Sequence, residues 1–238
     1  NGENIMTLPK IVTPTYELEI PSSKEKITYR PFLVKEEKIL LLAQEAGEES
    51  DILNAIKQII KNCTFEEVEV NDMALFDLEY IFLRIRSKSV GEKVELKLLC
   101  DDDGETYADV TIDLDEVTVD FPKEHTNNIQ LTDTISLVMR YPQMSALSLT
   151  TVSDTETIFH MIKTSIRQII DGETIYEQVD FTEEDLDAFI ESLTSEHFKN
   201  IQEFFQTMPK LKHVVKYKNP KTKKQNKRTL EGLNSFFV

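Results

Sequence analysis

The 238-residue sequence has no tryptophan, only six glycines and only two cysteines. So few glycines exclude collagen-like, Gly-rich and multi-blade β architectures, because these need many turn residues. Cys63 and Cys100 stand far apart and form no C-x-x-C pair. We therefore expect a reducing cytoplasm, no disulfide scaffold and no structural zinc. The sequence also has no run of roughly 18 apolar residues and no secretory leader pattern, so we expect no membrane segment or membrane partner.

Apolar residues make up 40% of the chain and charged residues 29%. This amount of Ile, Leu and Phe is enough to bury a core, so the composition is typical of a folded, globular protein rather than a disordered chain. Several long segments have apolar residues at helical spacing, which indicates a helix-rich body.

The net charge of −16 is unevenly distributed. Residues 210–228 contain nine basic residues and no acidic one. A basic segment on an acidic body indicates a surface that contacts an acidic protein partner. The alternatives are a solvated hairpin that lysines keep soluble, or a nucleic-acid contact that the acidic body disfavours. The candidate partner-binding residues in this segment are Lys216, Lys218, Lys221, Lys223, Lys224, Lys227 and Arg228.

Residues 1–121 are expected to form an N-terminal α+β half. Alternating apolar residues on both sides of a polar turn predict a β-hairpin over 16–31. Three helices should follow: one over 34–46 that Gly47 ends, one from about Asp51, and one from near Asp72 that Gly91 ends. A second hairpin is predicted over 93–113, with its turn at Asp101–Gly104.

Residues 129–238 are expected to form the C-terminal half. A helix over 153–170 should begin at a capping box of Ser153 and Glu156, and further helices should be capped by Thr182 and Ser195. The basic hairpin is predicted over 213–230. The chain then ends in an apolar segment that either docks a partner or folds back onto the core; its candidate binding residues are Leu233, Phe236 and Phe237.

The two halves show the same order of parts, because IKQII at 56–60 and IRQII at 166–170 both end predicted helices and both precede a hairpin. We predict an α+β fold with a helix-rich body and projecting β-hairpins. Its halves are either a duplicated unit of helical pair plus hairpin, or two unrelated halves with a chance similarity.

No catalytic motif is present: the sequence has no G-x-S-x-G, no P-loop and no G-x-G-x-x-G. The four histidines His125, His160, His197 and His213 are scattered along the sequence. A catalytic site built from Glu36, Glu37, Asp154 and His160 receives less support than a protein-binding or a nucleic-acid-binding function. The acidic run at 101–105 lacks the glycine and glutamate spacing of a calcium loop and is typical of a tight turn. We expect no catalytic residues, no cofactor and no metal.

Two strings are more specific than any general helix pattern requires: PFLVKEEK within residues 30–63 and FLRIRSKSVGE within residues 76–98. Together with MRYPQM at 139–144 and LEGLNSFF at 230–237, they resemble the baseplate hub proteins of T-even-type bacteriophages. The resemblance is strongest over Leu18–Leu114, nearly half the chain.

The resemblance implies a non-enzymatic protein for tail baseplate hub assembly, either a hub subunit or an assembly chaperone that leaves before the particle is complete. It implies other hub or tail proteins as partners, and the host bacterial cytoplasm or the virion tail baseplate as the location. No catalytic residue carries over. The alternative hypothesis is a nucleic-acid-binding regulator that uses the basic hairpin.

Overall fold

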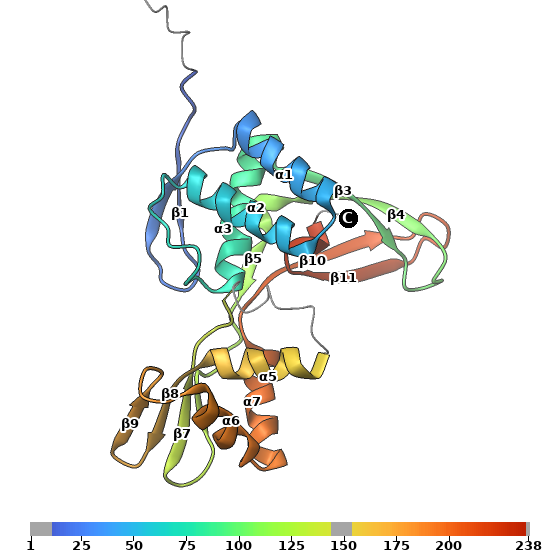
Figure 1. Cartoon of the computed structure of the whole chain (residues 1–238). Helices are drawn as coiled ribbons and strands as arrows, with labels where there is room; N and C mark the ends of the chain where they lie inside the picture. Colours follow the sequence, from blue (N-terminus) through green and yellow to red (C-terminus); the bar gives the residue numbers. More distant parts are fainter. Residues whose placement is uncertain (1–10, 144–153, 237–238) are drawn as a thin grey trace, which may run out of the picture.

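Helices and small antiparallel sheets alternate along residues 11–143 and 154–236, which are the residues that the computed structural model describes (Figure 1). Helices make up 38% and strands 29% of the structure, and the strands form four separate sheets. The expected α+β class is confirmed. The chain forms a large lobe, residues 16–120 and 210–236, and a small lobe, whose described residues are 128–143 and 154–207.

The large lobe begins with the predicted hairpin and three helices. Strands β1 (Tyr16–Glu19) and β2 (Lys26–Tyr29) precede α1 (Val34–Ala46), α2 (Glu49–Cys63) and α3 (Leu75–Val90). Gly47 ends α1 in the left-handed conformation at φ 76°, as expected for a helix C-cap. The third helix begins three residues later than Asp72. The buried stripe of α2 includes Ile59, Ile60 and Cys63, which are fully buried at the centre of the lobe.

The predicted second hairpin follows α3. Strands β3 (Lys93–Leu99) and β4 (Tyr107–Asp113) pair along seven residues, and the Asp101–Gly104 turn joins them with Gly104 at φ 66°. A short helix, η1 (Leu114–Glu116), leads into β5 (Thr118–Asp120), after which the chain leaves the large lobe.

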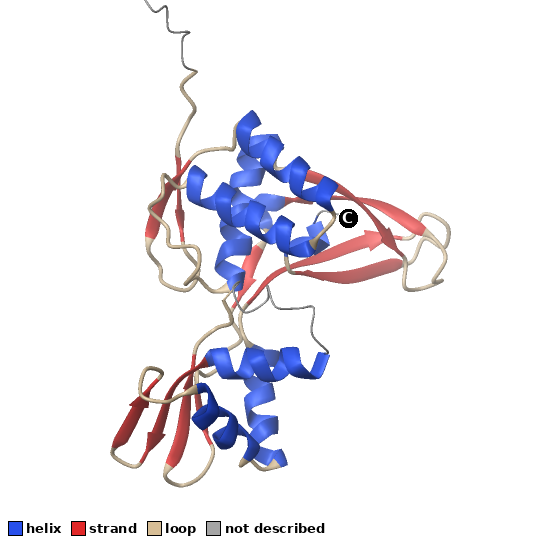
Figure 2. Ribbon diagram, viewed as in Figure 1, coloured by secondary structure: helices blue, strands red, loops and turns tan. Residues whose placement is uncertain are grey.

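The small lobe is a four-stranded sheet covered on one face by helices (Figure 2). Its central strands bury Leu137 and Ile166 against Ile201 and Phe204. The elements in chain order are β6 (Asn128–Gln130), β7 (Ile135–Met139), α5 (Asp154–Ser165), β8 (Ile166–Asp171), β9 (Thr174–Glu177), α6 (Glu183–Glu191) and α7 (Ser195–Thr207).

The helix predicted over 153–170 is wrong beyond Ser165, because Ile166–Asp171 form strand β8. This Ile-rich stretch pairs with β7 and β9, and Gly172 at φ 58° makes the two-residue turn between β8 and β9. IKQII and IRQII therefore lie in different kinds of element, so the predicted duplication loses its main support. Ser153 lies outside the described residues. The box at Thr182 is confirmed, whereas Thr194 rather than Ser195 caps α7.

The chain then returns to the large lobe. Strand β10 (Lys210–Lys218) pairs with β5 on one side and with β11 (Gln225–Glu231) on the other, and η2 (Leu233–Phe236) follows. Leu211, Val215, Tyr217 and Leu230 belong to the core of the large lobe. The C-terminal hairpin thus packs with the N-terminal elements, which differs from the predicted grouping of residues 129–238, because β5 supplies its partner strand.

Aromatic side chains join the two lobes at the point where the chain crosses between them. Phe76 of α3 contacts Tyr141 edge-to-face, with ring centroids 5.0 Å apart. Tyr141 stacks on His125 at 5.6 Å, and His125 lies 5.1 Å from Phe204 of α7. A continuous row of rings therefore connects α3 to the core of the small lobe.

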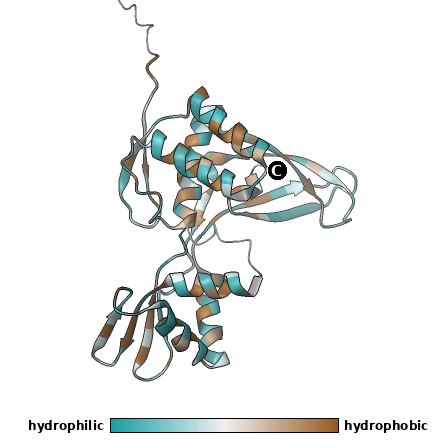
Figure 3. Cartoon of the chain, in the orientation of Figure 1, coloured by the Kyte–Doolittle hydropathy of each residue, from teal (hydrophilic) through white to brown (hydrophobic). Residues whose placement is uncertain are grey.

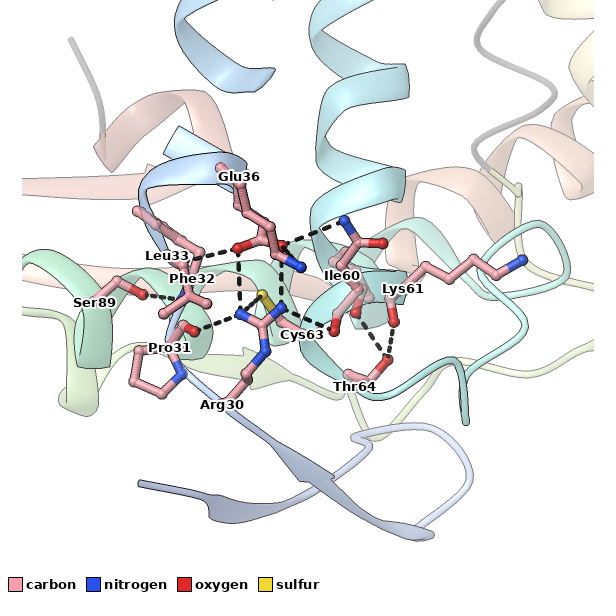
Figure 4. Close-up of polar contacts among 12 residues, drawn as sticks. Arg30, Pro31, Phe32, Leu33, Glu36, Ile60, Lys61, Cys63, Thr64 and Ser89 are labelled. Atoms are coloured by element: carbon pink, nitrogen blue, oxygen red, sulfur yellow. Dashed lines mark hydrogen bonds and ion pairs between the residues drawn. The ribbon is translucent and has the colours of Figure 1, made fainter. Parts of the chain in front are cut away.

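A buried ion pair holds β2, α1 and α2 together (Figure 4). The Arg30 guanidinium donates to both carboxylate oxygens of Glu36, at 3.3 and 3.1 Å, and to the Asn62 carbonyl at 3.3 Å. Glu36 also accepts from the Leu33 backbone N–H at 2.9 Å, which stabilises the first turn of α1. Burial alone would raise the pKa of Glu36, but these hydrogen bonds together lower it.

We predict that Arg30→Met lowers the free energy of unfolding by about 3–5 kcal/mol, because it leaves the fully buried Glu36 carboxylate without its main partner. Chemical denaturation measures this loss. Lys35→Met is the matched control: the Lys35 ammonium is also 3.4 Å from Glu36, but its side chain is 65% exposed. The control should change stability by only about 0–1 kcal/mol. Equal losses in the two variants would contradict the role assigned to Arg30.

Candidate protein-binding surface

The β10–β11 hairpin has one buried and one charged face. Val215 and Tyr217 point into the large lobe, while Lys216 and Lys218 alternate with them on the opposite face and are exposed. Lys227 of β11 lies directly opposite Lys216 and is exposed as well. The outer face of the hairpin therefore presents three ammonium groups on two adjacent strands.

The turn of the hairpin extends this charge. All seven basic residues predicted to bind a partner are exposed, and Lys221, Lys223 and Lys224 lie in the turn between the strands. The end of the hairpin is coloured as hydrophilic in Figure 3. Within the described part of the chain, only Lys221 of these seven forms an ion pair, 3.5 Å from Glu105.

The acidic turn between β3 and β4 fixes the end of the basic hairpin. The Asp102 carboxylate accepts hydrogen bonds from Thr222 at 2.5 Å, from Asn219 at 2.9 Å and from Asn226 at 2.8 Å. The Asp102 backbone N–H donates back to Asn226 at 3.2 Å. One carboxylate thus joins two hairpins that are more than 100 residues apart in sequence.

The hydrogen bonds from Thr222 and Asn219 hold the pKa of Asp102 below its ordinary value. The neighbouring Asp103 accepts from the Thr106 hydroxyl and backbone N–H, at 2.7 and 3.0 Å, which stabilises the β3–β4 turn. Two of the three aspartates are therefore used in hydrogen bonds within the fold. This arrangement agrees with the turn interpretation of the acidic run.

A second set of contacts anchors the middle of the hairpin. The Tyr217 hydroxyl donates to the Leu99 carbonyl at 2.8 Å, and its ring lies in the core. Asn219 accepts from the backbone N–H groups of Lys221 and Thr222, at 2.7 and 3.1 Å, which shapes the turn. These anchors could not be predicted from the local sequence, in which the Asn-Pro pair at 219–220 indicates only a turn.

The apolar terminus does not form an exposed docking segment in the described residues. Leu233 is 7% exposed and Phe236 is fully buried, because η2 folds back onto the core, which is the alternative considered from the sequence. The Leu233 backbone N–H donates to Glu79 at 3.0 Å and fixes this position. Both side chains line a cavity of about 560 Å³ between α1 and α3. Phe237 lies outside the described residues.

The described residues contain no cluster with the composition of a metal site. Within residues 11–143 and 154–236, no group of three or more His, Cys, Asp or Glu side chains could hold a metal ion. Glu36 is used in the Arg30 ion pair, and burial raises the pKa of the Cys63 thiol to about 11. In the same part of the chain, no helix is both long and apolar enough to span a bilayer.

A family model for the T4 bacteriophage base plate protein matches residues 13–238, nearly the whole chain. The chain belongs to this family, which confirms the resemblance inferred from the sequence strings. Membership implies contacts with other phage baseplate or tail proteins. No curated protein and no solved structure matches the chain.

We predict that Asp102→Ala loosens the end of the basic hairpin without unfolding the large lobe. The substitution removes the acceptor that Asn219, Thr222 and Asn226 share, whereas β10 keeps its pairing with β5. Hydrogen exchange should become faster at residues 219–226 and stay unchanged in α2. Asp101→Ala is the matched control in the same turn. Unchanged exchange at the hairpin end would show that Asp102 does not anchor it.

The pH dependence of this anchor has a definite sign. Because the pKa of Asp102 is lowered in the folded state, its contribution is complete above its unfolded pKa of about 4. The contribution should disappear as the pH falls through the lower folded value. In Asp102→Ala the exchange at residues 219–226 should lack this acid-dependent increase. The same acid dependence in the variant and in the unchanged protein would contradict the assignment.

Proposed function

We propose that this chain is a hub subunit or a hub-assembly protein of a phage tail baseplate, and that it binds its partners through the basic outer face of the β10–β11 hairpin. The observation that carries the proposal is the placement of Lys216 opposite Lys227 on an exposed face. Neither lysine has an ion-pair partner among the described residues. Tyr217, Asn219 and Asn226 also anchor the hairpin to the β3–β4 hairpin, which defines where its strands place these lysines.

Like charges directly opposite each other weaken an antiparallel strand pair. Nothing in the fold requires Lys216 and Lys227 to be basic, because both side chains are exposed and the packing depends on Val215 and Tyr217. Arrangements that lower the stability of a protein are typical of its functional sites. An acidic partner surface would turn this repulsion into attraction, and it would also increase the rate of association.

Nucleic-acid binding receives less support. Proteins that bind single strands without sequence preference stack bases on exposed aromatic rings. The only Phe, Tyr or Trp side chain of the hairpin strands, Tyr217, is 6% exposed and points into the core. The hairpin therefore offers charge without a stacking surface, and the acidic remainder of the chain repels phosphates.

The proposal is tested with the triple variant Lys216→Gln, Lys218→Gln and Lys227→Gln. We expect association with baseplate proteins from an infected-cell lysate to become about tenfold slower at low salt, and its salt dependence to weaken, because electrostatic steering is lost. Surface plasmon resonance with purified baseplate intermediates measures both quantities. Stability should stay equal or rise.

The matched control changes three exposed lysines elsewhere to glutamine: Lys38, Lys61 and Lys123. It alters the net charge by the same amount and should leave association unchanged. Equal effects of the two triple variants would sink the proposed role of the hairpin.

A hub subunit is present in the mature phage particle, whereas an assembly chaperone is absent from it. Quantitative mass spectrometry of washed particles and of infected-cell lysate distinguishes them. A fixed stoichiometric presence in particles identifies a subunit, whereas abundance in lysate with absence from particles identifies a chaperone. The triple variant should reduce either the incorporation or the yield of baseplates.

A further inference from the structure

The β8–β9 hairpin of the small lobe leaves a strand edge without a partner strand. At this edge the backbone N–H of Glu177 donates to the Asp180 carboxylate at 2.7 Å and its C=O accepts from the Asp180 N–H at 2.8 Å, so the free outward groups of β9 are those of Ile175. β9 is the last strand in the order β6-β7-β8-β9, and it pairs only with β8 among the described residues. Every residue from 171 to 180 is exposed. Ile175 and Tyr176 of β9 are 56% and 44% exposed, and Val179 just beyond it is 90% exposed. We refer to residues 171–180 as the β9 arm.

An exposed edge strand with apolar side chains is a ready template for a strand of another chain. Proteins usually protect such edges with lysine. The β9 arm instead has only acidic charges: Asp171, Glu173, Glu177 and Asp180, and no Lys or Arg. None of these four carboxylates forms an ion pair with a described residue. The edge therefore repels acidic strands and attracts a basic one.

A basic edge strand with free charges is present on the same chain. β11 is the outer strand in the order β11-β10-β5, and it has Lys227 and Arg228 at its centre. Lys216 and Lys218 extend this charge on the adjacent strand. β9 lies at the outer edge of the small lobe and the basic hairpin on the large lobe (Figure 1), and no ion pair links them within the described residues of one molecule. Each is thus left for a second molecule.

We propose that the β9 arm of one copy docks on the basic hairpin of a second copy, with Ile175 of β9 against the free edge of β11. This rests on the proposed function, because it names a partner for the same hairpin. The backbone N–H and C=O of Ile175 supply hydrogen bonds to the β11 edge, and the Ile175 and Tyr176 side chains supply apolar contacts. Glu173 in the turn before β9 and Glu177 at the end of β9 set the orientation against the basic residues of β11. Because the two surfaces differ, copies join head to tail into a ring or an open chain.

The test uses two purified full-length variants. Hairpin reversal is Lys227→Glu with Arg228→Glu, and arm reversal is Glu173→Lys with Glu177→Lys. Sedimentation velocity of the unchanged protein at low salt should show associated species that dissociate at high salt. Each variant alone should associate more weakly, because Lys227→Glu with Arg228→Glu replaces attraction by repulsion at the β11 edge, and Glu173→Lys with Glu177→Lys leaves the arm without net charge.

Mixing the two variants should restore association. The arm of the hairpin-reversed chain is still acidic and meets the fully basic hairpin of the arm-reversed chain. The control pair Glu124→Lys and Glu191→Lys changes the same charge at exposed sites outside the arm and should leave the associated species unchanged. Circular dichroism verifies that each variant is folded.

Two results would overturn this inference: an unchanged protein that stays monomeric at low salt, or a mixture of folded variants that does not associate. Either result leaves the proposed function standing if the Lys216, Lys218 and Lys227 variant still fails to enter baseplates. Restored association in the mixture supports the head-to-tail contact. If the mixture associates and the Lys216, Lys218 and Lys227 variant enters baseplates normally, the head-to-tail contact is supported and only the proposed function fails.

Discussion

Three residue pairs between β5 and β10 determine how the rest of the chain is arranged. Lys210, Leu211 and Lys212 pair with Asp120, Val119 and Thr118, and Lys212 forms an ion pair with Asp120 at 2.9 Å. The chain leaves the large lobe at β5 and re-enters it at β10, so this ladder brings both crossings side by side. It also gives β10 a fixed start, from which the basic hairpin extends along the β3–β4 hairpin.

The ends of these two hairpins have opposite charge, yet only part of that charge is neutralised within the molecule. Asp102 binds amide and hydroxyl groups rather than ammonium groups, so it holds the hairpin without masking its lysines. Polar anchors of this kind fix the geometry of a charged surface and leave its ammonium groups unpaired. The small lobe has an acidic arm, so the molecule presents surfaces of opposite sign on its two lobes.

Local signals explain which elements were predictable from the sequence. Gly47 and Gly91 end their helices, the Asp101–Gly104 turn closes a hairpin, and Thr182 caps α6, because each depends on residues close in the chain. The segment Ile166–Ile170 was misassigned because its apolar spacing suits both a helix and a strand. The available partner strand β7 decided the outcome. The Asp171-Gly172 pair was the local sign of the strand turn that followed.

Non-local contacts explain the rest. The Asp102 anchor joins residues more than 100 positions apart, and the burial of Phe236 depends on walls supplied by α1 and α3. The lysines of the candidate site were identified from charge alone, since exposed charge requires no partner within the fold. The sequence did not predict which contacts fix the position of the strands that carry these lysines.

The large lobe is encoded by two separated stretches of sequence, with the small lobe inserted between them. During synthesis, the small-lobe residues leave the ribosome before Leu211, Val215, Leu230 and Phe236, which complete the core of the large lobe. The N-terminal elements therefore keep part of their apolar surface exposed until these residues are synthesised, whereas the small lobe can already fold. Assembly of the large lobe is thus a late event that depends on joining the two ends of the chain.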